Sequence, residues 1–212
     1  MNRRHLLVTL ALPFATKAQN LDLPRSSLID ATAFYIIPTD DIDENTCAQM
    51  ARALTKALNV LVKSTTWAPS EVKEPLPGSN QYASEDYFPM GARVARTLKD
   101  TSPRTYFIVL TTRDINTRSQ NFRFQFSTHS PMANTSVLSI ARLLHDSAGS
   151  RATDKVIGDR VAKMFVRIIG EMRLGWKRSS DSKDVMFAPI MSIEDIDKMD
   201  IEHSMQARRQ PR

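Results

Sequence analysis

The stretch RVAKMFVRIIGEMRLGWKRSSDSKDVMFAPIMSIEDIDK, residues 160–198, decides the fold of this chain. Its apolar residues recur at the i, i+3, i+4, i+7 spacing that one buried face of a helix requires. These residues are Val161, Met164, Phe165, Ile168, Ile169 and Met172. The pattern predicts a long core helix over 154–174, followed by a glycine, a polar loop and an irregular C-terminal part. Periodicity alone therefore assigns this helix a packing role.

The segments before this helix predict the other layers of the domain. Strands are expected at 33–37, 106–111, 121–127 and 137–140, helices at 46–62 and 90–98, and a proline-rich loop at 68–89. Residues 121–127, NFRFQFS, alternate apolar and polar side chains, which is typical of a half-exposed strand at a sheet edge. This order of elements predicts an α+β, α/β-like domain with a mixed sheet.

Length and charge indicate one domain with two basic ends. A chain of 212 residues is long enough for a single core. We expect an N-terminal segment at 1–20, a domain at 21–204 and a tail at 205–212. The net charge of +6 resides at the two ends, so that 21–204 is neutral overall. The basic residues are Arg3, Arg4 and Lys17 at one end and Arg208, Arg209 and Arg212 at the other. Such ends either bind RNA, anionic lipid or acidic protein surfaces, or remain solvated tails.

The N-terminal segment has the composition of a targeting sequence. Residues 1–20 combine basic residues with an apolar run over 6–15 and contain no acid. A mitochondrial presequence and a secretory signal both fit this pattern, and the run is too short for a membrane span. The single cysteine, Cys47, cannot form an internal disulfide, which favours a reducing compartment or the mitochondrial matrix.

Several motifs make the chain resemble the archaemetzincins, a family of compact zinc metallopeptidases. The family motif is H-E-x-x-H-x-x-G-x-x-H-C, followed by C-x-M and a later C-x-x-C pair. Placing Asp184-Val185-Met186 on the family's C-V-M, with the run SIEDID at 192–197 behind it, puts Gly175 on the motif glycine. Met186 then takes the place of the methionine that forms the floor of the metal site. The resemblance covers residues 33–204 and implies a metzincin-type mixed sheet with a long former active-site helix.

The resemblance also implies which positions would hold metal, and the chain departs from the family there. The three zinc-ligand positions carry Ile168, Met172 and Arg178, and the position of the catalytic glutamate carries Ile169. The four positions of the family's second zinc carry Ser179, Asp184, Ser204 and Ala207. Zinc requires imidazole, thiolate or carboxylate donors, and among these residues Asp184 alone offers one. We therefore expect no metal, no cofactor and no enzymatic activity.

These observations favour a catalytically inactive, archaemetzincin-like structural subunit of a large mitochondrial assembly. The mitochondrial ribosome is the first choice, because a charge of +3 at each end suits contact with rRNA. A respiratory or ATP-synthase complex is the alternative. The expected partners are protein subunits, with rRNA bound through the basic ends and no membrane span.

Two other functions remain open. A non-catalytic peptide-binding protein would keep the former cleft open and pair an extended peptide with the edge strand expected at 121–127. A peptidase with a relocated metal site would need a spatial cluster of acids and histidines that the sequence does not reveal.

The remaining reactive residues have simple interpretations. His5, His129, His145 and His203 share no ligand spacing, and we expect them at the surface. Cys47 lies on the apolar face of a predicted helix and should be a buried, inert thiol. Glu171 lies on the long helix beside the altered motif and is expected to face solvent.

Two clusters allow both a functional and a structural interpretation. The acidic residues Asp40, Asp41, Asp43 and Glu44 could hold a cation, but compensation of the helix dipole is favoured, with Asn45 or Thr46 as the cap. Phe122, Phe124 and Phe126, with Arg123 between them, could stack on RNA bases. A strand that packs one face on the core is favoured there.

Overall fold

The computed structural model describes residues 33–39, 42–72, 74–119 and 121–209, so the segment expected at 1–20 lies outside it. The large sheet contains β1 (Phe34–Pro38), β2 (Val62–Ser64), β4 (Tyr106–Thr111), β6 (Ser127–Ser130) and β7 (Thr135–Ser139). A small sheet pairs β3 (Tyr82–Ala83) with β5 (Ile115–Asn116). The helices are α1 (Glu44–Leu58), α2 (Pro89–Ala95), α3 (Asp154–Met172), α4 (Ile193–Lys198) and α5 (Ile201–Arg209). Short 3₁₀ turns are η2 (Ser84–Tyr87), η3 (Pro131–Ala133) and η4 (Ala141–Leu144).

The large sheet is mixed, as the sequence predicts. Its strand order is β2-β1-β4-β7-β6. The first four strands in that order are parallel, and β6 alone runs antiparallel, beside β7. The prediction of an α+β domain with a mixed sheet is therefore confirmed.

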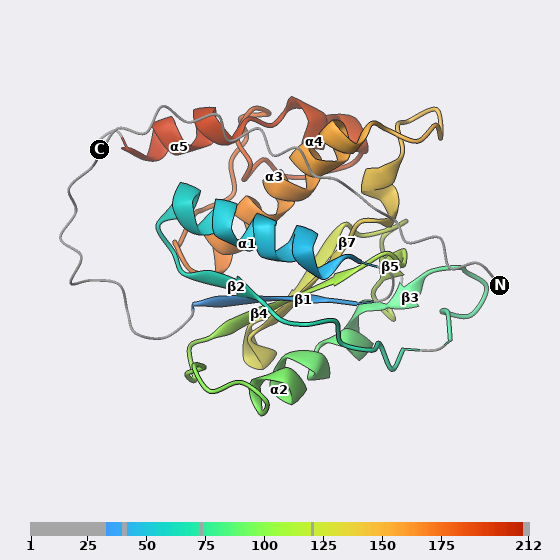
Figure 1. Ribbon diagram of the computed structural model, residues 1–212. Helices are drawn as coiled ribbons and strands as arrows, with labels where there is room; N and C mark the ends of the chain where they lie inside the picture. The colour runs from blue at the N-terminus through green and yellow to red at the C-terminus, as the bar shows by residue number, and fades with distance from the viewer. Residues whose placement is uncertain (1–32, 40–41, 73, 120, 210–212) are drawn as a thin grey trace.

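Helices cover both faces of this sheet (Figure 1). Alternate strand residues supply the two cores, because successive side chains point to opposite faces. Phe34, Ile36 and Ile108 belong to the core beneath α1 and α3, whereas Tyr35 and Phe107 belong to the core that α2 covers. The central strands are buried on both faces, which explains their nearly continuous apolar sequences.

The N-cap of helix α1 lies two or three residues before the expected caps, Asn45 and Thr46. Asp43 is the N-cap, and its carboxylate accepts hydrogen bonds from the Thr46 backbone N–H and hydroxyl, both at 2.7 Å. The helix ends where Asn59 adopts the left-handed conformation at φ 52°. The predicted capping role of the acidic segment is thus confirmed for Asp43, whereas Asp40 and Asp41 lie outside the described residues.

The edge strand lies C-terminal to its predicted position at 121–127, so that prediction is wrong. The edge strand is β6, Ser127–Ser130, and most of 121–126 forms a loop. Two side chains explain the difference, because Asn116 and Gln81 donate to the carbonyls of Phe122 and Arg123 at 2.8 and 3.0 Å. These bonds satisfy main-chain groups that a strand would have paired with a neighbour.

The predicted long helix is confirmed as α3, and it is buried on two sides. The predicted apolar stripe faces the sheet, and Val161, Phe165, Ile168 and Ile169 are each at most 3% exposed. A second stripe, which we call the cation row, consists of Arg160, Lys163 and Arg167, each at most 5% exposed. Burying three cations is costly unless each finds hydrogen-bond acceptors.

The cation row finds those acceptors in η4, in α4 and in the loops around α3. Arg160 binds both carboxylate oxygens of Asp197 at 2.7 Å and the carbonyls of Leu143 and His145 at 3.0 and 2.9 Å. Arg167 donates to the carbonyls of Val185 and Phe187 at 2.7 and 2.8 Å. The cation row therefore fastens 184–198 to the helix.

The expected boundary between the domain and the basic tail falls inside a helix. Helix α5 runs through position 204 to Arg209, whereas the sequence places the boundary between 204 and 205.

In the part of the chain that the structure describes, every helix is too short or too polar to cross a bilayer.

Replacing Arg160 by Met should lower the free energy of unfolding by about 1–3 kcal/mol, since it leaves the Leu143 and His145 carbonyls without their donor. Urea denaturation of the two proteins measures this difference. Arg151→Met is the matched control. Both side chains of the Arg151–Asp154 pair are more than 40% exposed, so the loss of this pair should lower the free energy of unfolding by less than about 1 kcal/mol. Equal losses in both variants would contradict the role of the cation row.

Candidate functional site

The positions aligned with the family's first zinc lie on and just after the C-terminal half of α3. We call Ile168, Ile169, Met172 and Arg178 the first-site positions. Ile168 and Ile169 are fully buried, and Met172 packs against the same core as a partly buried side chain. Isoleucine has no lone pair to give a metal, and a thioether alone is a weak zinc ligand. The residues at these positions do not fit a zinc ion.

Arg178, the last of the first-site positions, forms an ion pair with Glu171 of α3. Its Nη2 donates to Glu171 Oε1 at 2.8 Å. The second carboxylate oxygen of Glu171 is buried and has no hydrogen-bond partner among the described residues. The expectation that Glu171 faces solvent is therefore wrong, because its side chain is only 24% exposed and pairs with Arg178.

His129 is also misplaced by the sequence interpretation, which put it at the surface. It lies on the edge strand β6, and its Nδ1 is 2.8 Å from Ser136 Oγ on β7. Ser136 in turn donates to the Tyr106 hydroxyl at 3.1 Å. His129 and Ser136 are directly opposite in the antiparallel pair, so their side chains share one face of the sheet. His145 is exposed as expected, and His5 lies outside the described residues.

Burial and neighbouring charges hold His129 in its neutral form. Loss of water around the ring lowers the pKa of His129 to about 4, and Arg178 and Arg167 lower the pKa further while Glu171 raises it. Burial likewise raises the pKa of Tyr106. The polar group at this end of α3 therefore combines a neutral imidazole with one carboxylate and two guanidinium groups.

The frame residues of the motif have clear structural roles in this chain. Gly175 has φ +67°, a backbone conformation that residues with a Cβ rarely adopt. Met186 is fully buried in the main core. Trp176 lies against Gly170, where an added Cβ would approach the indole ring to 2.3 Å. A glycine at 170 is thus required for the tryptophan to pack there.

The positions aligned with the second zinc, which we call the second-site positions, are Ser179, Asp184, Ser204 and Ala207. Three of them are joined to one short segment through hydrogen bonds. Ser204 Oγ accepts from the Val185 N–H at 2.8 Å, and Asp184 Oδ1 accepts from the Met186 N–H at 2.9 Å. The Ser179 N–H donates to the Met186 carbonyl at 3.0 Å. Ala207 is exposed on α5.

An ion pair completes the connection between this segment and α5. Arg208 Nη2 donates to both oxygens of Asp184 at 2.9 and 3.0 Å, and its guanidinium lies 4.2 Å above the centre of the Trp176 ring. We call Asp184, Ser204, Arg208 and Trp176 the C-terminal clip. Arg208 is therefore engaged inside the domain, while Arg3, Arg4, Lys17, Arg212 and the side chain of Arg209 lie outside the described residues.

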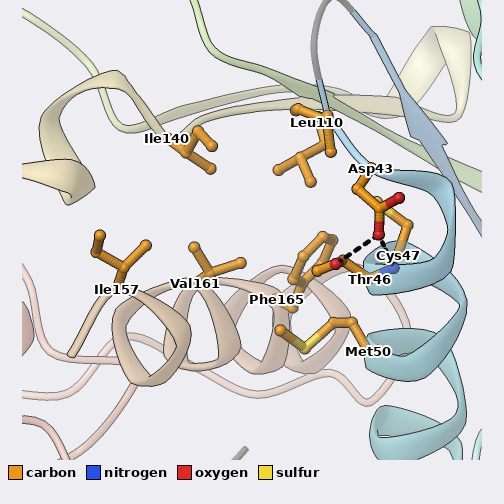
Figure 2. Close-up of a pocket in the computed structure, with 10 residues that line it drawn as sticks. Asp43, Thr46, Cys47, Met50, Leu110, Ile140, Ile157, Val161 and Phe165 are labelled. Carbon is orange, nitrogen blue, oxygen red and sulfur yellow. Dashed lines mark hydrogen bonds between the residues drawn. The ribbon is translucent and has the colours of Figure 1, made fainter. Parts of the chain in front are cut away.

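A separate apolar pocket lies between α1 and α3. Figure 2 shows Ile157, Val161 and Phe165 of α3 opposite Cys47 and Met50 of α1, all of them lining the pocket. Burial and the charges of Asp43 and Glu44 raise the pKa of Cys47 to about 12, so the predicted inert thiol is confirmed. The pocket uses positions 157–165 of α3 and contains none of the first-site positions. Within the described ranges, no group of three or more His, Cys, Asp or Glu residues could hold a metal ion.

Two solved structures share this fold. A zinc-dependent peptidase from Methanocorpusculum labreanum matches with a TM-score of 0.67 and 16% identity, over 79% of this chain and 94% of that one. Archaemetzincin from Archaeoglobus fulgidus, in complex with malonate, matches with a TM-score of 0.58 and 25% identity, over 79% and 92% of the two chains. No protein-family model matches, and neither does any curated protein. The fold is archaemetzincin-like.

These similarities correct the expectation that the chain is not an enzyme. A zinc-dependent peptidase has this fold, so the comparison points toward a peptidase rather than a non-enzyme. The loss of donors in one motif register does not amount to the loss of all catalysis, because missing zinc ligands exclude one mechanism at one place.

Protonation of His129 should destabilise the fold in mild acid. The folded protein lowers the pKa of His129 to about 4 from its ordinary value of 6.5, so the unfolded chain binds the proton first. Stability is therefore full above pH 6.5 and falls between pH 6.5 and 4, on the order of 1–3 kcal/mol from this group. Urea denaturation across this range should show a weaker pH dependence for His129→Gln than for the wild type. The exposed His145→Gln variant should follow the wild type, and equal slopes for all three proteins would exclude the proposed burial of the imidazole.

The C-terminal clip should hold α5 without metal. Asp184→Asn removes the ion pair with Arg208 and should cost about 1–3 kcal/mol in urea denaturation, since the pair is largely buried. Glu71→Gln breaks the exposed pair with Arg93 and should have an effect of less than about 1 kcal/mol. A chelator should leave the melting temperature of the wild type unchanged. A drop in melting temperature on chelation would show that a metal, rather than the clip, fastens this region.

Proposed function

We propose that this chain is an archaemetzincin-like protein whose zinc-ligand positions have been replaced, and that it serves as a subunit of a larger assembly. The observation that supports this most is the filling of both aligned sites. Two first-site positions are fully buried isoleucines, and two second-site positions, Asp184 and Ser204, belong to the C-terminal clip. Both regions thus stabilise the domain itself, which leaves its surface and ends to serve as contacts.

The charge distribution suggests which assembly to test first. The N-terminal end carries +3, and the C-terminal end carries Arg209 and Arg212 beyond the Arg208–Asp184 ion pair, on a body that is neutral overall. Cationic ends on a neutral domain suit a particle rich in RNA, since each basic residue that meets a phosphate releases bound counterions. We therefore propose the mitochondrial ribosome as the first candidate, with a respiratory or ATP-synthase complex as the alternative.

The comparison with a zinc-dependent peptidase favours a second candidate, action on an extended peptide. The main-chain bond from Ser139 N–H to the Phe126 carbonyl sets the register of β6 on β7. In that register Ser127 and His129 direct their backbone groups away from β7. Within the described residues β6 is the last strand of the sheet, so an added peptide strand could pair with it there.

Sedimentation of the native protein tests the first candidate. The full-length chain, tagged in its own cells, should sediment in a gradient with a particle of ribosomal size, because its ends bind that particle. Elemental analysis of the purified protein should find no stoichiometric zinc, since the first-site positions lack donors. Sedimentation as a free monomer, or one zinc per chain, would contradict the proposal.

The same purified protein distinguishes the second candidate. It is incubated with a mixed peptide library, with and without added zinc, and the products are identified by mass spectrometry. Cleavage that disappears on chelation would establish the peptidase and displace the subunit proposal. Peptide binding that persists without cleavage and is weakened by a proline in place of Ser127, whose backbone N–H faces away from β7, would instead support strand addition.

A further inference from the structure

The loop between β5 and β6 presents one large aromatic side chain to solvent. The three phenylalanines expected on a single strand separate here, because Phe122 is 61% exposed while Phe126 is 6% exposed. Phe124 packs edge-on against Phe126 with ring centres 5.2 Å apart, and Arg142 lies 4.1 Å above its ring. Phe122 thus takes no part in the packing that the other two rings share.

The backbone beside Phe122 is held firmly in place. Asn116, which is only 2% exposed, donates to the Phe122 carbonyl at 2.8 Å and to Gln81 Oε1 at 2.9 Å. Gln81 donates to the Arg123 carbonyl at 3.0 Å. A buried amide network therefore fixes the loop, and the ring is exposed on a preorganised support. Preorganisation lowers the entropy lost when such a side chain binds a partner.

The segment around this ring is basic in sequence, and one of its arginines has no acidic partner among the described residues. Residues 115–145 contain Arg118, Arg123 and Arg142 and no Asp or Glu. Arg142 pairs with Asp114, and Arg118 pairs with Asp86 while its backbone N–H donates to Glu85. Arg123 is exposed beside Phe122 and forms no ion pair with any described residue. The Phe122 surface, which we define as Phe122 and Arg123, therefore offers one exposed ring and one available guanidinium group.

An exposed ring beside an available guanidinium group has a definite chemical complement. An aromatic face stacks on an unpaired nucleobase, and a guanidinium group binds a phosphate oxygen. The next strand in the chain, β6, carries Ser127, Thr128 and Ser130, which add hydroxyl groups and no negative charge. Single-stranded RNA presents bases, phosphates and 2′-hydroxyls to match all of these.

We propose that the Phe122 surface binds single-stranded RNA, with Phe122 stacked on a base and Arg123 on a flanking phosphate. This inference rests on the proposed function, because it adds an RNA contact within the folded domain to the subunit role. Naked RNA tests it separately from membership in any particle.

The test uses the full-length protein and a fluorescein-labelled, unstructured 12-nucleotide RNA, with binding followed by anisotropy. Phe122→Ala should weaken binding about 10-fold, since stacking on one base contributes roughly 1–3 kcal/mol. Met132→Ala is the matched control, because Met132 is fully exposed on η3, and its loss should leave affinity unchanged. Arg123→Gln should lower the slope of log affinity against log salt by about 0.7, the value for one phosphate contact on a single strand.

The outcomes separate this inference from the subunit proposal. Equal affinity of wild type and Phe122→Ala, or no RNA binding by the wild type, would overturn the Phe122 surface even where the protein sediments with a particle. Weaker RNA binding by Phe122→Ala, with unchanged circular dichroism and melting temperature, would support the surface even where sedimentation fails.

Discussion

The structure depends on the burial of α3 on two sides at once. Its apolar stripe packs on the sheet, and its cation row is buried against segments that have little regular structure. Arg160 and Arg167 donate to the carbonyls of Leu143, His145, Val185 and Phe187. Such carbonyls would otherwise be buried without partners, at a cost comparable to a lost hydrogen bond for each. Order in the C-terminal part is therefore imposed from the helix.

The first-site and second-site positions follow from this arrangement. Ile168 and Ile169 extend the apolar stripe toward the C-terminal end of α3, so the core continues to where the family resemblance would place a metal. Beyond the helix, Gly175 turns the chain, and Trp176 returns to cover Gly170. The indole then supports Arg208, which reaches Asp184. Core packing and the C-terminal clip form one continuous structure.

Much of this fold could be predicted from sequence, because its signals are local. The apolar spacing from Val161 to Met172 predicts α3, and the apolar run at 106–111 coincides with β4. The cation row was missed although Arg160, Lys163 and Arg167 also lie at helical spacing, since charged residues are usually assigned to a solvated face. The approach of His129 to Glu171 and Arg178 depends on strand register, which no local pattern reveals. The shift of the edge strand has a similar cause, because Gln81 binds a loop 42 positions away in the chain.

The C-terminal clip has a consequence for the chemistry to which the protein can be exposed. A zinc site built from cysteines depends on thiolates, which oxidants convert to disulfides or sulfenic acids and which then release their metal. The carboxylate of Asp184, the hydroxyl of Ser204 and the guanidinium of Arg208 have no comparable oxidation. The chain's single thiol, Cys47, is 2% exposed on another helix. The polar groups of the C-terminal clip thus lack the thiolate chemistry through which oxidants release metal from a cysteine site.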